Sequence, residues 1–136
     1  MFAEDLPIMK KMEELMAMWS DCVVLLPKLY KYTYGQRMID ILLDMMELIV
    51  FANEDVSGRK EHLEKFLARF ALFKMLSRML NKKQVLSVKQ SANLSRVCAV
   101  IGKQATGWKK SMGSDNQARP STECDGSQRS SYKRFC

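Results

Sequence analysis

Apolar residues recur at intervals of three and four along most of the chain, which is the spacing of side chains on one face of an α-helix. The first stretch of this kind covers residues 8–26, and Pro27 ends or kinks the helix that it predicts. Its apolar positions are Met12, Leu15, Met16, Trp19, Cys22, Val23 and Leu26. This pattern predicts an amphipathic helix that packs against a core.

A second helix is expected to begin near Thr33. Thr33 and Gln36 have the spacing of a capping box, in which each side chain accepts a hydrogen bond from the backbone amide of the other residue. The helix should last until about Asn53. A polar turn follows, in which Asp55 or Ser57 is available to cap the next helix.

Two further helices follow with a short break between them. The third is predicted over residues 60–80 and ends at the polar residues 81–83. The fourth begins at a second capping box, formed by Ser87 and Gln90, and extends to about Lys110. Because the connections are short, consecutive helices should run antiparallel. The sequence therefore predicts an all-α fold, an up-down-up-down four-helix bundle.

The composition changes after Ser111. Residues 112–136 are rich in Gly, Ser, Asp, Asn, Gln and Arg, and their apolar residues are too sparse to offset the entropy that an ordered chain loses. With 47% hydrophobic residues overall, the rest of the chain is long enough for one domain with a real core. We expect a bundle domain over residues 1–111 and a disordered polar tail over residues 112–136.

Positive charge is concentrated in the second half of the chain. Residues 1–58 carry ten acids and five bases, whereas residues 59–136 carry five acids and seventeen bases, so the net charge of +7 divides into −5 and +12. Residues 65–114 contain eleven Lys or Arg and no Asp or Glu. A solvated helix face normally mixes both signs, whereas this segregation is typical of a surface that binds a polyanion such as nucleic acid.

Four cations of this acid-free stretch recur at intervals of seven residues, namely Lys89, Arg96, Lys103 and Lys110. Seven residues fall about 20° short of two helical turns, so these side chains form one stripe roughly 30 Å long. The stripe lies opposite the apolar face of the fourth helix and should face outward. The predicted nucleic-acid-binding residues are Arg69, Lys74, Arg78, Lys82, Lys83, Lys89, Arg96, Lys103, Lys109 and Lys110.

The second and third helices carry more apolar surface than one bundle core can cover. Each has an apolar face for the core and a second apolar face directed elsewhere. Spare apolar faces on adjacent helices predict a subunit interface; the alternative is a very buried hairpin in a lopsided monomer. The predicted interface residues are Ile39, Leu43, Met46, Val50, Leu72, Met75 and Met79.

The best candidates for catalysis are acidic. Asp44 with Glu47, and Glu61 with Glu64, have the spacing of carboxylate pairs that bind metal ions between the helices of a bundle. Both pairs fall on polar helix faces directed away from the core, so a solvated acidic edge fits the pattern better. His62 is the only histidine and has no recognisable nucleophile partner. We therefore expect no enzyme, no metal site and no cofactor.

The sequence also bears on compartment. No apolar run approaches the roughly 18 residues of a membrane span, and the N-terminal residues lack a basic segment followed by an apolar one. Cys22 and Cys98 fall on apolar helix faces and Cys124 and Cys136 in the polar tail, without CxxC or Cys/His metal spacing. We expect a soluble cytoplasmic protein in which Cys22 and Cys98 are buried thiols.

Several segments match one family in order and spacing. Residues 27–37, Pro-Lys-Leu-Tyr-Lys-Tyr-Thr-Tyr-Gly-Gln-Arg, are similar to the Pro-(basic)-x-(aromatic)-Thr-x-Gly-x-(basic) motif of the Avd accessory proteins of diversity-generating retroelements. Residues 63–80, 86–90 and 101–111 also resemble this family. The resemblance covers about residues 8–111.

The resemblance implies a homopentameric barrel of four-helix protomers that binds the retroelement's reverse transcriptase together with RNA or cDNA, and so supports mutagenic reverse transcription and retrohoming. The polar tail with its two cysteines departs from the shorter family pattern. Sister four-helix proteins encoded in ribosomal-RNA intervening sequences share much of the pattern. A basic four-helix module that binds an acidic protein partner is therefore the alternative. The cations that match basic positions of the family are Arg69, Lys74, Arg78, Lys89, Arg96 and Lys103.

Overall fold

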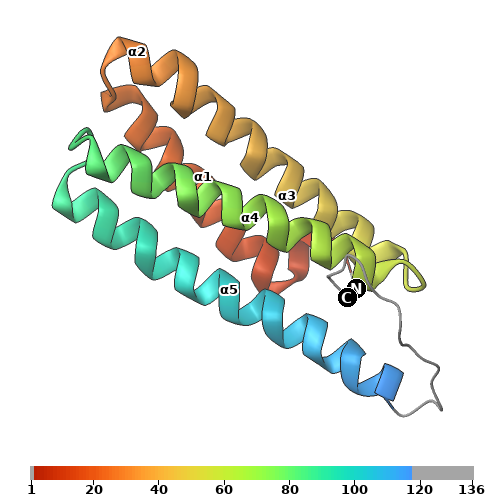
Figure 1. Cartoon of the computed structure of the whole chain (residues 1–136). Helices are drawn as coiled ribbons and strands as arrows, with labels where there is room; N and C mark the ends of the chain where they lie inside the picture. The colour runs from red at the N-terminus through yellow and green to blue at the C-terminus, as the bar shows by residue number, and fades with distance from the viewer. Residues whose placement is uncertain (1, 118–136) are drawn as a thin grey trace. The chain divides into compact units, whose positions relative to one another are not determined.

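The computed structural model describes the backbone of residues 2–117 and the side chains of residues 2–112. Over this range the chain is almost entirely helical, without a strand, and four long helices dominate it (Figure 1). The all-α prediction is confirmed. Two compact units divide the chain between Thr106 and Gly107. The long helices are α1 (Pro7–Leu25), α3 (Gln36–Glu54), α4 (Arg59–Lys82) and α5 (Val88–Gln117).

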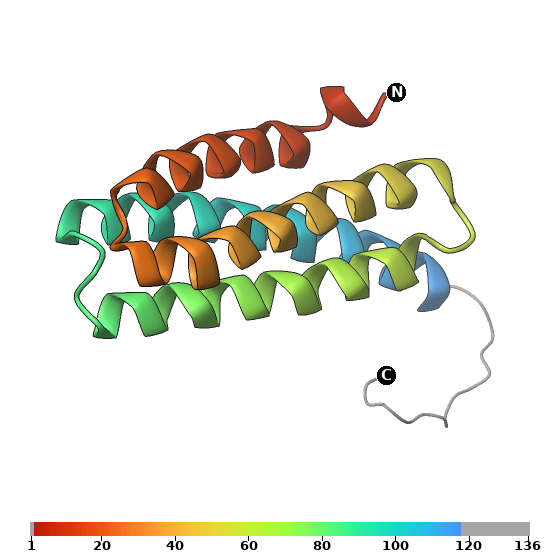
Figure 2. The same cartoon turned by 90° about the horizontal axis from the view of Figure 1, so that it is seen from above.

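In the first unit, which ends at Thr106, the long helices run lengthwise beside one another (Figure 2). Trp19 of α1 is fully buried, and its ring meets Phe73 of α4 edge-to-face with the centroids 5.8 Å apart. Gly102 of α5 lies against Phe70, because a Cβ at Gly102 would be 3.6 Å from the Phe70 ring. The core therefore lies where α1, α4 and α5 meet, and α3 adds residues such as Met38, Ile41, Leu42, Met45 and Ile49.

The connection between α1 and α3 is helical rather than a loop. After Pro27 the chain forms α2 (Lys28–Tyr30) and a π-helical turn (Lys31–Gly35), which continues directly into α3. The predicted capping box at Thr33 and Gln36 is therefore wrong. Thr33 already lies inside a helix, so its hydroxyl donates to the Leu29 carbonyl four residues earlier, at 2.6 Å.

Gly35 permits close approach at this junction. The indole N–H of Trp19 donates to the Gly35 carbonyl at 3.2 Å. A Cβ at Gly35 would lie only 3.2–3.3 Å from the side chains of Val23 and Leu26. A methyl group at Gly35 would therefore require these two side chains to move by a few tenths of an ångström.

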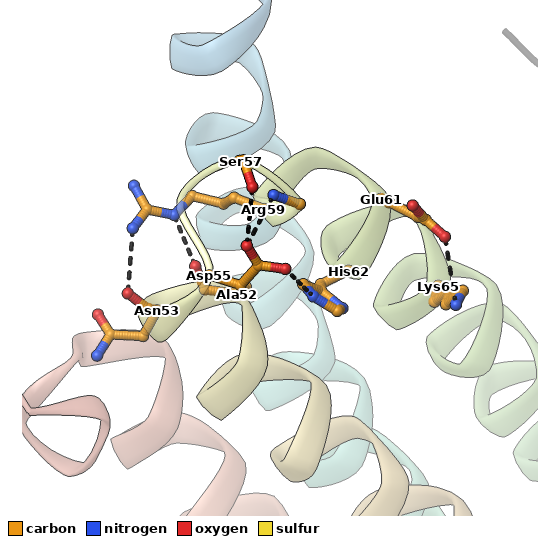
Figure 3. A network of polar contacts seen from close by, with 9 residues as sticks. Ala52, Asn53, Asp55, Ser57, Arg59, Glu61, His62 and Lys65 are labelled. Carbon is orange, nitrogen blue, oxygen red and sulfur yellow. Dashed lines mark hydrogen bonds and ion pairs between the residues drawn. The ribbon is translucent and has the colours of Figure 1, made fainter.

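The turn between α3 and α4 is held by two polar side chains (Figure 3). The Asp55 carboxylate accepts hydrogen bonds from the Gly58 amide and the Ser57 hydroxyl, both at 3.1 Å. Arg59 donates through its guanidinium to the carbonyls of Ala52, at 2.6 Å, and Asn53, at 3.1 Å. Arg59 thus satisfies carbonyls at the end of α3. Asp55 orders the turn, although Gly58 itself is the N-cap of α4 and has no side-chain cap bond.

The turn between α4 and α5 combines a capping motif at the C-terminus of α4 with a capping motif at the N-terminus of α5. The amide of Gln84 donates to the Asn81 carbonyl and that of Val85 to the Leu80 carbonyl, the two bonds of a Schellman motif. Gln84 occupies its left-handed position, with φ of 61°. The predicted capping box at Ser87 and Gln90 is confirmed, because each side chain accepts from the other's amide, at 3.0 and 2.8 Å.

The second unit begins at Gly107 and contains the last turns of α5. This helix continues past its predicted end near Lys110 as far as Gln117. The proposed tail of residues 112–136 therefore begins in helix, and its residues 118–136 lie outside the described range. Within the part of the chain that the structure describes, no helix is both long and apolar enough to cross a membrane.

Candidate nucleic-acid interface

A groove of about 500 Å³ lies between α4 and α5 in the first unit. Its walls come from the C-terminal half of α4 and the N-terminal two-thirds of α5, and Leu86 of the connecting turn closes one end. Among the described residues, no Asp or Glu lines it. The lining residues are Lys74, Ser77, Arg78, Asn81, Leu86, Ser91, Leu94, Ser95, Cys98, Ala99, Gly102, Lys103 and Thr106.

Three exposed cations stand on opposite walls of this groove. Lys74 and Arg78 come from α4, and Lys103 comes from α5. None of the three forms a salt bridge with a carboxylate of the described residues. The Lys74 ammonium lies over the Phe70 ring, 4.6 Å from its centroid, which orients it by a cation–π contact. The groove therefore presents positive charge that is available to an anion.

Neutral hydrogen-bonding groups line the same groove. The Ser91 hydroxyl donates to the Asn81 side-chain oxygen at 2.9 Å and so ties α5 to α4. The Ser77 hydroxyl is buried and has no hydrogen-bond partner among the described residues. Sequence reasoning missed these groups. The signal for them is a run of small residues at helical spacing on α5, namely Ser91, Ser95, Cys98, Gly102 and Thr106, which leaves room beside the helix.

Cys98 lines the groove as a protonated thiol. Burial raises its pKa to about 11, and the nearby charge of Lys74 only partly opposes this effect. Cys22 of α1 is buried, and its pKa is raised by burial and by the charge of Asp21. Both residues are free cysteines; Cys22 is buried as predicted, whereas Cys98 is only half-buried. Neither environment favours the thiolate, the form of cysteine that acts as a nucleophile.

Only part of the cationic stripe predicted for α5 lines the groove. Lys89, Arg96 and Lys103 are exposed in the first unit, but only Lys103 lines the groove. Arg96 donates to the Asn93 side chain at 3.4 Å. Lys82 and Lys83 are exposed where α4 ends. The remaining predicted contacts, the half-buried Lys109 and the exposed Lys110, belong to the second unit.

Arg69 lies apart from the groove cations Lys74, Arg78 and Lys103. Its guanidinium faces the Asp44 carboxylate of α3, with 3.9 Å between the nearest atoms. Both side chains line a second groove, between α3 and α4, together with Glu47 and Lys65. The two acids there offset the two bases. The structure thus separates Arg69 from Lys74 and Arg78, which lie on the opposite side of α4.

The sequence matches a known family over most of its length. The bAvd-like family covers residues 6–112, which span all of α1, α3 and α4 and most of α5. The chain belongs to the bAvd-like family. Neither the curated proteins nor the solved structures compared with it include a match.

Membership of the bAvd-like family confirms the resemblance drawn from residues 27–37 and the later segments. It identifies the chain in general terms as an Avd-type accessory protein of retroelements. Such proteins form an accessory family rather than a family of enzymes. The groove and the cations described above lie within the matched residues.

The predicted interface residues of this bAvd-like chain are only partly covered by its own fold. Leu43, Met75 and Met79 are 52%, 49% and 41% exposed, which is unusual for large apolar side chains. The others are half-buried: Ile39, Met46, Val50 and Leu72. Leu72 lines the α3–α4 groove together with the charged residues of that groove.

The acidic candidates for catalysis are placed apart. Asp44 pairs with Arg69, whereas Glu61 pairs with Lys65 at 3.5 Å on the surface of α4. Among the described residues, no group of three or more His, Cys, Asp or Glu side chains is placed to hold a metal ion.

His62 serves the α3–α4 turn. Its Nε2 lies 3.1 Å from the Asp55 carboxylate, and its ring lies 5.6 Å from that of Phe51. The hydrogen bond with His62 is the main cause that lowers the pKa of Asp55, helped by the bonds from Gly58 and Ser57. The other ring nitrogen, Nδ1, is buried, and the part of the chain that the structure describes offers it no hydrogen-bond partner.

Proposed function

We propose that this bAvd-like chain is a non-catalytic accessory protein of a diversity-generating retroelement that binds nucleic acid and the element's reverse transcriptase. Its task is to hold RNA and cDNA beside the polymerase during mutagenic reverse transcription and retrohoming. The observation that carries the proposal is the acid-free cationic surface of α4 and α5, which lies inside the region matched to the family.

The binding proposed here is electrostatic and tolerant of sequence. Exposed lysines and arginines neutralise phosphates and release counterions, which makes affinity fall as salt rises. No aromatic side chain lines the α4–α5 groove, so the stacking platforms typical of base-selective single-strand binding are missing from it. The expected role is to gather and position a strand.

Assembly is part of the proposal. Antiparallel up-down-up-down protomers would associate through the exposed apolar residues Leu43, Met75 and Met79 into a homopentameric barrel and so repeat the cationic surface around the particle. Light scattering after size-exclusion chromatography should give the mass of five chains of 15.7 kDa. A clean monomer would overturn this part of the proposal.

Fluorescence anisotropy with a labelled 20-nucleotide RNA, at 50, 100 and 200 mM salt, tests nucleic-acid binding. Log affinity should fall linearly with log salt, by about 0.7 for each neutralised phosphate of a single strand. The variant Lys89→Glu, Arg96→Glu, Lys103→Glu should lose binding while circular dichroism shows unchanged helical content. Absent or salt-independent binding of the wild-type protein would refute the proposal.

Binding to the reverse transcriptase is tested by copurification after nuclease treatment. Retention of the polymerase supports a direct contact, and its loss shows that nucleic acid bridged the two proteins. The alternative role, a module for an acidic protein partner, requires a direct protein contact together with no affinity for RNA or DNA.

A further inference from the structure

We infer that the groove between α4 and α5 is the binding site for a single nucleic-acid strand, and that the outward cations Lys89 and Arg96 only raise the surrounding potential. This inference rests on the proposed nucleic-acid binding and adds the site and the form of the ligand. It differs from the heptad pattern, which favours the outward stripe as a whole.

Charge from two walls focuses on the groove. Lys74 and Arg78 approach it from α4 and Lys103 approaches it from α5, and no acid lines it. Cations on both walls of a groove attract a bound phosphate from two sides. The walls of the groove have a lower dielectric constant than water, so they weaken this attraction less than open solvent does. Lys89 and Arg96, by contrast, are exposed on one helix and stand outside the groove.

The size of the groove favours one strand over a duplex. Its volume of about 500 Å³ falls within the range of roughly 300–1,000 Å³ typical of small-ligand pockets, which suits a nucleotide or two. A duplex keeps its bases stacked inside and presents mainly phosphates, so it would rest on the rim. A single strand can place sugar and base edges inside as well.

The groove surface matches the mixed chemistry of a nucleotide. Small residues such as Ala99 and Gly102 leave a shallow apolar surface for a sugar or a base. Ser95 and Thr106 supply hydroxyls at its sides, and the unpartnered Ser77 hydroxyl gains an acceptor if it rotates toward a bound strand. An acidic helix from a protein would instead need deep pockets for large apolar anchors.

A matched pair of double variants tests the location. Lys74→Gln with Arg78→Gln removes two groove cations, and Lys89→Gln with Arg96→Gln removes one Lys and one Arg that are exposed outside the groove. We expect the Lys74→Gln, Arg78→Gln variant to bind a labelled ten-nucleotide single strand about tenfold more weakly. The slope of log affinity against log salt should fall by about 1.4, the contribution of two phosphate contacts. The outward pair should change affinity less than threefold.

A second pair of variants blocks the groove without changing charge. Ala99 lines the groove, whereas Ala92, one heptad earlier on α5, is exposed and does not line it. Ala99→Trp should lower affinity for the single strand about tenfold or more, and Ala92→Trp should leave it within threefold. Thermal melts by circular dichroism verify that each variant keeps its helices, so that a binding loss reports the site.

The outcomes separate the inference from the proposed function. If the wild-type protein binds no strand, the proposed function fails. If it binds but both double variants lose affinity equally, or if Ala99→Trp has no effect, the groove assignment is overturned. A duplex of the same length that binds as tightly, with equal sensitivity to Ala99→Trp, overturns the single-strand assignment. If Ala99→Trp abolishes binding of a labelled ten-residue polyglutamate but leaves that of the strand, the groove belongs to an acidic protein partner.

Discussion

Replacement of Trp19 by alanine should remove a large share of the stability of the fold. The side chain is fully buried, packs edge-to-face on Phe73 and donates to the Gly35 carbonyl at 3.2 Å. Truncation of a buried Trp or Phe to Ala costs roughly 3–5 kcal/mol, and loss of the hydrogen bond contributes about 1 kcal/mol of such a total. Small domains have about 5–15 kcal/mol in all, so Trp19→Ala should leave a marginal protein.

Urea unfolding followed by circular dichroism at 222 nm measures this effect. A loss of about 4 kcal/mol, with a urea dependence of about 2 kcal/mol per molar, lowers the midpoint by roughly 2 M. Trp19→Phe keeps a ring against Phe73 and should cost only roughly 1–2 kcal/mol. All variants are compared at one protein concentration, because oligomer dissociation is linked to unfolding.

The other tryptophan provides the control. Trp108 is half-buried and lies in the second unit, so Trp108→Ala should move the midpoint by less than half as much. The reasoning fails if Trp19→Ala costs less than about 1 kcal/mol, since a fully buried ring cannot then be part of the core. It also fails if Trp19→Phe is as destabilising as Trp19→Ala, since the ring contact with Phe73 would then contribute nothing.

Three further predictions concern single side chains. Gln84→Gly should raise the free energy of unfolding by roughly 0.5–1 kcal/mol in urea titrations, because glycine adopts the left-handed φ of 61° without strain. Cys98 should react with iodoacetamide at pH 8 some 10- to 100-fold more slowly in folded than in urea-unfolded protein, because its pKa is about 11 against an ordinary 9.0; equal rates would contradict the raised pKa. The pKa of Asp55 is lowered from 3.8, so its stabilisation holds above that value and is lost as pH falls through the folded pKa. Asp55→Asn should therefore lower the melting temperature at pH 6 and flatten the fall of the melting temperature as pH drops below 3.8.

The two capping-box motifs show what local sequence can and cannot predict. Ser87 and Gln90 follow a helix end at the left-handed Gln84, so nothing precedes them that could continue as helix, and the box forms. Thr33 and Gln36 have the same spacing, but the chain is already helical from Lys28. Trp19, sixteen residues before Gly35, donates to the Gly35 carbonyl where this helical segment meets α3. A short window of sequence does not contain this contact.

The candidate site was predictable in composition but not in arrangement. The acid-free stretch and the outward direction of Lys103 follow from the sequence and the helical repeat. The repeat gives the direction of a side chain relative to the core, but it does not say which helix lies beside it. Arg69 and Lys74 belong to one helix and one acid-free stretch, yet Arg69 faces Asp44 of α3 and Lys74 lines the groove against α5. The packing of the neighbouring helices therefore decides whether a cation lies beside a carboxylate or is available to bind an anion.

The placement of these side chains divides the outer surface of α4 lengthwise. Toward α3 lie Arg69 and Lys65 with their acidic neighbours, and toward α5 lie Lys74 and Arg78. The exposed Met75 and Met79 line neither groove. A subunit that docked on these methionines would therefore cover apolar surface between the two grooves and leave the cationic walls toward α5 in solvent. The proposed assembly and the proposed strand binding would then use different sides of one helix, so the apolar residues and the cations of α4 would not compete for the same surface.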